Sequence, residues 1–219
     1  MDPFENSAPI AQPEPPSFSP KPYRKAVSRL GWGAFTLMLL TQVLAVGMMY
    51  LFAAIMPPAF LASSWYAWML TYLPLYLVAF PIFWFMVRRL PAIQPEKKAS
   101  CTPATFCKLV ILCLGITYLL NYFSYFINYL LGLLKGGEVM NPLATVATDP
   151  LSSFVFGGLV APIMEELTYR KIILNRLMPM GERTAVYGTA FLFALFHANL
   201  SQLFYAFVLG IILAQLAVR

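Results

Sequence analysis

The chain of 219 residues is 60% hydrophobic and only 11% charged, with a net charge of +6 at neutral pH. Soluble domains are usually about 45–50% apolar and about 25% charged, so this composition excludes an ordinary water-soluble globular protein. A chain this apolar has to place much of its surface in lipid, and it is therefore predicted to be an integral membrane protein.

The N-terminal region, residues 1–30, is predicted to be a disordered cytoplasmic tail. Its first twenty residues are rich in proline and serine and show no periodic apolar pattern, which is typical of disordered segments. The apolar run that follows starts too late, and is too long, for a cleaved secretory signal. Residues 31–219 are expected to form a transmembrane helical domain.

Apolar segments then follow in chain order, and the first four are long enough to cross a bilayer as helices, which takes about 20 residues. The segments cover residues 33–55, 65–87, 109–134, 151 to about 174, about 185–197 and 201–218. The last two are shorter and are separated by almost no loop. The sequence therefore predicts an all-α fold, a multi-pass transmembrane bundle of about six helices.

The placement of the basic residues predicts how these helices cross the membrane. Lysine and arginine precede the first helix and follow the second and fourth helices, whereas Lys135 alone lies on the opposite side. Basic residues are enriched on the cytoplasmic side of membrane proteins, so we expect a cytoplasmic N-terminus. No stacking motif or basic helix face indicates nucleic-acid binding.

The stretch "APIMEELTYRKIIL", residues 161–174, places Glu165, Glu166 and Arg170 in an otherwise apolar segment. An ionised side chain costs about 2.5–3.5 kcal/mol at the centre of a membrane helix on insertion scales, and two neighbouring carboxylates also repel each other. No packing requirement explains this cost, so we interpret the cluster as a functional site. Pro162 removes a backbone hydrogen bond just before the acids, which favours a kink and a small wet pocket.

The two glutamates are expected to have different roles, because they point about 100° apart on a helix. Glu166 and Arg170 lie four residues apart on one face, which suits a salt bridge. That leaves Glu165 as the freer carboxylate. In a purely structural alternative, both acids only partner Arg170 and neighbouring polar groups.

The segment "FLFALFHANL", residues 191–200, carries His197, the only histidine of the chain. A lone histidine on an apolar face is commonly a packed core residue, but this one shares the membrane with a second costly polar cluster. A rise of about 1.5 Å per residue allows Glu165 and His197 to meet inside the membrane. Together they can hold and deprotonate a water, or share a divalent metal such as zinc that does so.

These residues resemble the CPBP family of CAAX-protease and bacteriocin-processing intramembrane endopeptidases, also called Abi proteins. The family pattern E-E-x-x-x-R matches Glu165, Glu166 and Arg170, and F-x-x-x-H matches Phe193 and His197. The similarity covers roughly residues 151–219. It implies an all-helical membrane fold with a cavity facing the cytoplasm, in which Glu165 activates the hydrolytic water beside His197, and Glu166 and Arg170 support the site.

The resemblance leaves the use of a metal open, and Glu165 and His197 would be its ligands in a metalloprotease. The family also carries a third motif, a second histidine followed four residues later by asparagine or aspartate. This chain has no second histidine and ends at Arg219. We therefore expect either a fragment of a longer protein, which the end directly after an apolar helix favours, or a family member that has lost part of its site. In either case the chain as given would be inactive without that motif.

The sequence thus predicts an intramembrane endopeptidase that cleaves membrane-tethered peptide or protein substrates from the cytoplasmic side. The alternative is a non-catalytic membrane protein, a bacteriocin-immunity factor or scaffold whose polar cluster only holds helices together. A transporter that carries protons or cations on the glutamates ranks lower, because the chain shows no repeated pair of broken helices. The expected partners are the lipid bilayer and a membrane-associated peptide.

Overall fold

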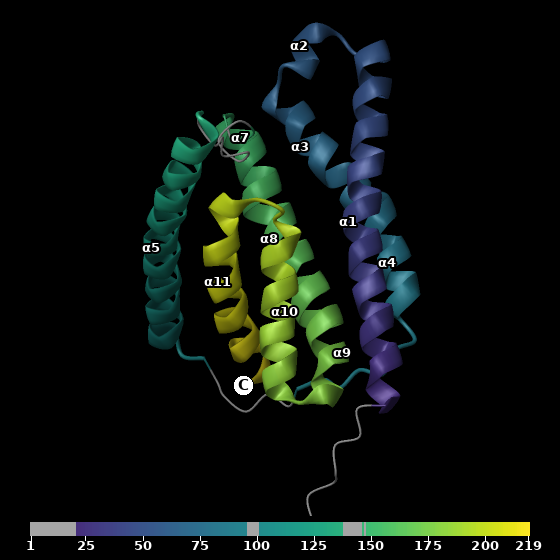
Figure 1. Ribbon diagram of the computed structural model, residues 1–219, viewed down its shortest axis with the longest axis vertical. Helices are drawn as coiled ribbons and strands as arrows, with labels where there is room; N and C mark the ends of the chain where they lie inside the picture. Colours follow the sequence, from purple (N-terminus) through teal and green to yellow (C-terminus); the bar gives the residue numbers. More distant parts are fainter. Residues whose placement is uncertain (1–20, 96–100, 138–145, 147) are drawn as a thin grey trace, which may run out of the picture.

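The computed structural model describes residues 21–95, 101–137, 146 and 148–219, and this part of the chain forms helices and no strand (Figure 1). Five helical stretches within it are long and apolar enough to cross a membrane, namely Tyr23–Ile55, Ser64–Val87, Pro103–Lys135, Pro150–Met180 and Leu200–Val218. The predicted all-α, multi-pass membrane bundle is therefore confirmed. The fifth of the predicted helices is present as α10 (Glu182–Phe196), but its 15 residues rise only about 22 Å, less than the roughly 30 Å of a bilayer core.

The first helix, α1 (Lys21–Ile55), begins ten residues before the expected limit of the tail. Residues 21–30 are helical because residues 23–30 contain no proline or glycine and extend the helix of the apolar run. The rest of the predicted tail, residues 1–20, lies outside the described residues. After the short helix α2 (Pro58–Leu61), α3 (Ser64–Leu73), the segment η1 (Pro74–Ala79) and α4 (Phe80–Val87) return along α1.

The second half of the described chain is built around the acidic segment. It contains α5 (Pro103–Lys135), α7 (Pro150–Ser152), η2 (Ser153–Val160), α8 (Ala161–Glu165), η3 (Glu166–Leu174), α9 (Asn175–Leu177), the 3-10 turn η4 (Met178–Met180), α10 and α11 (Leu200–Val218). Figure 1 shows α5 at one side of the bundle beside α11, α1 with α4 at the other side, and α8 to α10 between them. A buried hydrogen bond from Asn128 Nδ2 to Ser201 Oγ, 2.9 Å long, ties α5 to α11.

The segments η1, η2 and η3 are π-helical, with a wider turn than the α-helix. Proline lacks an N–H group and pushes the preceding turn apart, and such a residue stands at the start of η1 (Pro74) and just after η2 (Pro162). The distortion that the sequence predicts before the acids is thus present as π-helix. Such segments are rare and are frequently found at functional sites.

The helix that carries the acids is capped at its membrane entry by Asp149. Its carboxylate Oδ2 accepts a hydrogen bond of 2.7 Å from the Ser152 backbone N–H. This backbone bond, with a further contribution from the Ser152 side chain, holds the pKa of the Asp149 carboxyl below its usual value. The cap fixes where the long helical stretch from α7 to α9 begins.

Arg176 joins the two halves of the bundle. Its side chain is 8% exposed, and its Nε donates a 2.8 Å hydrogen bond to the carbonyl of Val87, the last residue of α4. Nη1 donates at 3.0 Å to a carbonyl of its own helix. Nearby, the Ile93 N–H donates to the Asn175 carbonyl at 2.8 Å. These contacts fix the hairpin of α1 to α4 against α9, and thereby the space between the two halves.

The basic residues gather at one end of the bundle. The start of α1, the end of α4, the start of α5, the turn between α9 and α10 and the C-terminus all lie there (Figure 1). We call this the basic end. The elements that meet there carry Arg24 and Lys25 at the start of α1, Arg88 and Arg89 just after α4, Arg183 at the start of α10 and Arg219 at the C-terminus. Lys135, which ends α5, lies at the opposite end.

Candidate active site

A cavity of about 650 Å³ lies between the two halves of the bundle, within the usual size range of ligand sites. Its lining comes from α1, α3, η1 and α4 on one side and from η2, α8, η3, α10 and α11 on the other. Both Glu165 and His197 line this cavity. The structure therefore brings together the carboxylate and the imidazole that the sequence singles out from two different helices.

Glu165 is the last residue of α8 and is half-buried in the cavity wall. Its carboxylate forms no hydrogen bond and no ion pair with any residue that the structure describes. It interacts electrostatically with the charged side chains of Arg170 and Glu166. The tyrosines that also interact with it are Tyr72, Tyr76, Tyr169 and Tyr205. A carboxylate that is not committed to a partner is free to hold a water and take its proton.

His197 ends α10, and its ring is held in one orientation. Nδ1 lies 2.8 Å from the Phe193 carbonyl oxygen, which can only accept, so we assign the proton of the neutral ring to Nδ1. The ring also packs edge-to-face on Phe193, with the centroids 4.9 Å apart. Nε2 therefore keeps a free lone pair and is the nitrogen that can act in the cavity.

The turn after His197 is fixed by Asn199. Ala198 has a φ of +51°, a left-handed conformation that is strained for a residue other than glycine. Asn199 caps α11 by accepting from the Gln202 N–H at 2.9 Å, and its Nδ2 donates to the His197 carbonyl at 2.8 Å. The sequence gives one signal for this support, an asparagine placed directly before an apolar helix.

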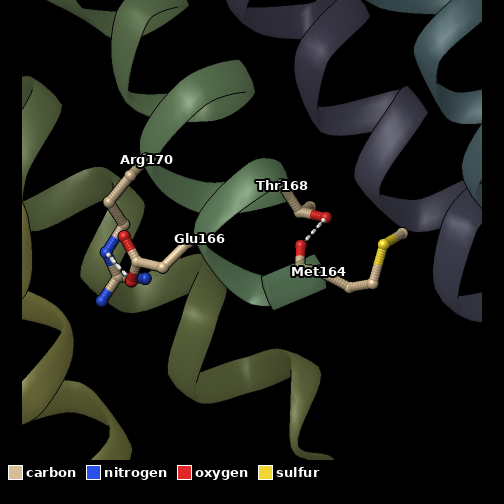
Figure 2. Close-up of polar contacts among 4 residues, drawn as sticks. All are labelled: Met164, Glu166, Thr168 and Arg170. Atoms are coloured by element: carbon tan, nitrogen blue, oxygen red, sulfur yellow. Dashed lines mark hydrogen bonds and ion pairs between the residues drawn. The ribbon is translucent and has the colours of Figure 1, made fainter. Parts of the chain in front are cut away.

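Glu166 and Arg170 form the predicted ion pair, with Nε and Oε1 3.3 Å apart. Figure 2 shows this pair on one side of the helix and Thr168, whose hydroxyl donates to the Met164 carbonyl at 2.7 Å, on the other side. Met164 and Thr168 line the cavity, whereas Glu166 and Arg170 do not. Helix geometry thus separates the glutamates, with Glu165 facing the cavity and Glu166 turned away.

Arg170 lies outside the cavity lining and contacts Phe193, which is part of that lining. Its guanidinium carbon lies 4.9 Å from the centre of the Phe193 ring, a cation–π contact. Tyr169 contacts the same ring edge-to-face, with centroids 4.9 Å apart. Phe193 contacts the His197 ring and accepts its Nδ1 hydrogen, so it links Arg170 to the imidazole.

The described residues include no group of three or more histidine, cysteine, aspartate or glutamate side chains placed to hold a metal ion. Catalytic zinc sites usually have three protein ligands. Glu165 and His197 supply two, so this pair alone does not fit a zinc site of that kind.

Residues 147–219 match the family model of the type II CAAX prenyl endopeptidases, described as Rce1-like. The match spans α7 to α11 and includes Glu165, Glu166, Arg170 and His197. This C-terminal region is Rce1-like. The resemblance to the CPBP family is thereby confirmed for this region, which begins at residue 147 rather than at the expected residue 151. No curated protein and no solved structure matches the chain. The Rce1-like region supports the general function of a CAAX-type membrane protease.

Sequence reasoning missed the half of the cavity wall that lies outside the Rce1-like region. Trp68, Tyr72 and Tyr76 line the cavity from α3 and η1. Their spacing of four residues places them on one helix face. This spacing was the sequence signal that could have indicated a shared aromatic wall. It is weak in a segment where aromatic side chains are frequent on every face.

Proposed function

We propose that this protein is an intramembrane endopeptidase that hydrolyses peptide bonds of membrane-associated substrates. The observation that carries the proposal is the cavity shared by His197 and the uncommitted carboxylate of Glu165. The Rce1-like region supports the reaction class. The cavity is built from membrane-spanning helices, which favours peptides that are themselves held in the bilayer.

In the proposed reaction Glu165 is the general base. It takes a proton from a water that is also hydrogen-bonded to Nε2 of His197, while the water oxygen bonds to the carbonyl carbon of the peptide. The electron pair of the carbonyl π bond moves to the oxygen and gives a tetrahedral oxyanion. When this intermediate collapses, the C–N bond breaks and Glu165 returns the proton to the leaving nitrogen.

Glu165→Gln tests the proposal because it removes the base and keeps the shape of the side chain. Protein in liposomes is incubated with a peptide panel, one farnesylated CAAX peptide and one unprenylated peptide on a transmembrane anchor, and products are identified by mass spectrometry. We expect Glu165→Gln and His197→Ala each to lower the cleavage rate at least about 100-fold. Glu182→Gln, which changes an exposed acid at the start of α10, is expected to leave the rate unchanged.

Cleavage that survives Glu165→Gln in folded protein would remove this residue from the mechanism. The alternative of a non-catalytic immunity factor or scaffold predicts that Glu165→Gln retains full biological activity.

The metalloprotease chemistry, the bacterial plasma membrane and the role in bacteriocin immunity stay predictions from the resemblance. A cytoplasmic N-terminus is part of the proposal, supported by the basic end.

A further inference from the structure

The first turns of α1 carry a positively charged face that the proposed hydrolysis does not use. The side chains of Arg24, Lys25 and Arg29 are all exposed. On a helix with 3.6 residues per turn, these three positions span only about 140° of the circumference. Leu30 and Leu37, which are buried against the rest of the bundle, point to the opposite side of the helix. The three cations therefore face away from the protein.

A cavity of about 540 Å³ lies on this face. The described residues that line it are Arg24, Lys25, Ser28, Arg29 and Trp32. Its floor is made of small residues, because Ser28 lies in the middle of the face and a Cβ atom added at the adjacent Gly31 would meet nothing within 4 Å. Long cationic side chains and an indole ring thus surround a short hydroxyl side chain. We call this cavity the α1 groove.

The cations of the α1 groove have no counter-charge in their part of the protein. Residues 21–95 contain lysine and arginine but no aspartate or glutamate. Arg24, Lys25 and Arg29 form no ion pair with any residue that the structure describes. The groove is therefore complementary in charge to an anion that comes from outside the described chain.

The end of α4 adds to this positive surface. Gly33 of α1 packs against Val87, since a Cβ atom added at Gly33 would lie 3.0 Å from Val87 Cγ1. Val87 is the last residue of α4, and the exposed Arg88 follows it. Arg29 precedes Gly33 by about one helical turn. Arg88 therefore lies near the level of Arg29 along the bundle, and the positive surface extends over two packed helices.

Beyond Arg29 the same exposed face of α1 becomes apolar. Trp32 is 62% exposed, and its ring meets that of the exposed Phe35 edge-to-face, with the centroids 5.8 Å apart. The exposed Leu39 and Val43 continue the face, which in a membrane-spanning helix contacts the acyl chains of lipids. Tryptophan is enriched at the level of the lipid headgroups. Since Arg29 lies only about 4.5 Å before Trp32 along the axis, the α1 groove lies at headgroup depth.

We propose that the α1 groove binds the phosphate of an anionic phospholipid whose acyl chains lie along the apolar face of the same helix. Guanidinium and ammonium groups form short, charge-assisted hydrogen bonds to phosphate oxygens, and the Ser28 hydroxyl adds a donor at the floor. A zwitterionic lipid brings its own cation to this surplus of positive charge, so the groove favours an anionic headgroup. This inference does not depend on the proposed function.

Lipid titrations of the purified full chain in detergent, followed by native mass spectrometry, test the charge requirement. We expect the wild type to bind dioleoylphosphatidylglycerol about 10-fold more tightly than dioleoylphosphatidylcholine. Arg24→Gln combined with Arg29→Gln is expected to weaken binding of the anionic lipid about 25-fold, or about fivefold for each cation removed. Lys108→Gln combined with Arg183→Gln removes two exposed cations from α5 and α10, and this matched control is expected to bind as the wild type does.

A second variant, Ser28→Leu, keeps every charge and fills the floor of the groove. We expect it to weaken binding of the anionic lipid about 10-fold, because the larger side chain excludes the phosphate. Val27→Leu, which enlarges an exposed residue outside the groove lining, is the control and should bind normally. Thermal unfolding in detergent is expected to be the same for all four variants, because every substituted side chain is exposed.

Four outcomes would overturn the proposal. Equal affinity for the two lipids would remove the preference for an anionic headgroup, and equal losses in the two double variants would reduce it to attraction by net charge. Unchanged binding in Ser28→Leu would show that the groove holds no phosphate. Displacement of the lipid by an equal concentration of inorganic phosphate would identify a soluble anion, rather than a lipid, as the ligand.

Discussion

Arg170 is almost fully buried, yet it is poorly hydrogen-bonded. Its side chain is 5% exposed, and its contact with Glu166, whose side chain is 54% exposed, lacks the geometry of a hydrogen bond. A buried ion of this kind gives little net stability, because the cost of removing it from water offsets the attraction to its partner. Its contact with Phe193 explains the residue better, since Phe193 positions the His197 ring.

We therefore expect Arg170→Met to lower kcat about 10-fold while changing the free energy of unfolding by no more than about 1 kcal/mol. Methionine fills a similar volume but does not hold Phe193 by a cation–π contact, so the imidazole becomes less well placed. Cleavage kinetics and thermal unfolding in detergent measure the two effects, with the exposed Arg89→Met as the control. A large loss of stability at unchanged kcat would contradict the positioning role.

Helical spacing alone separates Glu165 from Glu166 and pairs the latter with Arg170, because the angle between neighbouring side chains is a property of every helix. The same reasoning cannot find Tyr72 and Tyr76 in the cavity wall. Glu165 and His197 lie on helices that follow much later in the chain, and an aromatic residue in a membrane segment carries no free-energy cost that would mark it as functional. A charged side chain in lipid marks a candidate functional site because its insertion costs free energy, whereas a tyrosine carries no comparable cost.

The helices α10 and α11 approach each other closely at Gly210. A Cβ atom at this position would lie 2.9 Å from Ala190 Cα and 3.2 Å from Phe193 Cδ1. Small residues let membrane helices pack in this way. The contact matters for the site, because Phe193 supports the His197 ring on the other side.

Gly210→Ala is expected to destabilise the protein by about 1–3 kcal/mol, because the added methyl group forces the two helices apart. It is also expected to lower kcat by displacing Phe193. Thermal unfolding in detergent measures the first effect. Gly115→Ala in α5, where nothing lies within 4 Å of the added atom, is the matched control and should stabilise slightly. Equal stability of the two variants would show that α10 and α11 can separate freely.

Apolar length was sufficient to predict the helices to within a few residues at most ends. The extent of the π-helical segments could not be predicted. A π-helix is defined by which backbone carbonyl each N–H donates to, and hydropathy contains no information on that pattern. The short α10 illustrates a further limit. Its apolar sequence resembles that of a spanning helix, but His197 and the strained turn at Ala198 end it at the level of the cavity.

The cavity lining reaches from the middle of the bundle toward the end opposite the basic end. It includes Glu165, near the middle of the stretch from α7 to α9, and Trp68 in α3, a helix that lies toward that opposite end. Leu37 follows Arg29 by eight residues, and so lies about 12 Å further from the basic end.

Cysteine labelling in intact cells tests the orientation. Cys101 is exposed just before α5, at the basic end. With Cys107 and Cys113 replaced by serine, we expect a membrane-impermeant maleimide to spare Cys101, because the basic end faces the cytoplasm. A Lys135→Cys variant without the native cysteines is the control at the opposite end and should react. The reverse pattern would place the basic end, and the N-terminus, outside.

The junction at Arg176 has an evolutionary consequence. One part of the chain holds the acid and the imidazole, and another part, attached through Arg176 and through the backbone of Ile93 and Asn175, provides the facing wall. Under the proposed function, changes in the hairpin would therefore alter which peptides fit the cavity while Glu165 and His197 stay unchanged. An engineer who grafts a foreign hairpin at this junction would reprogram selectivity by the same route.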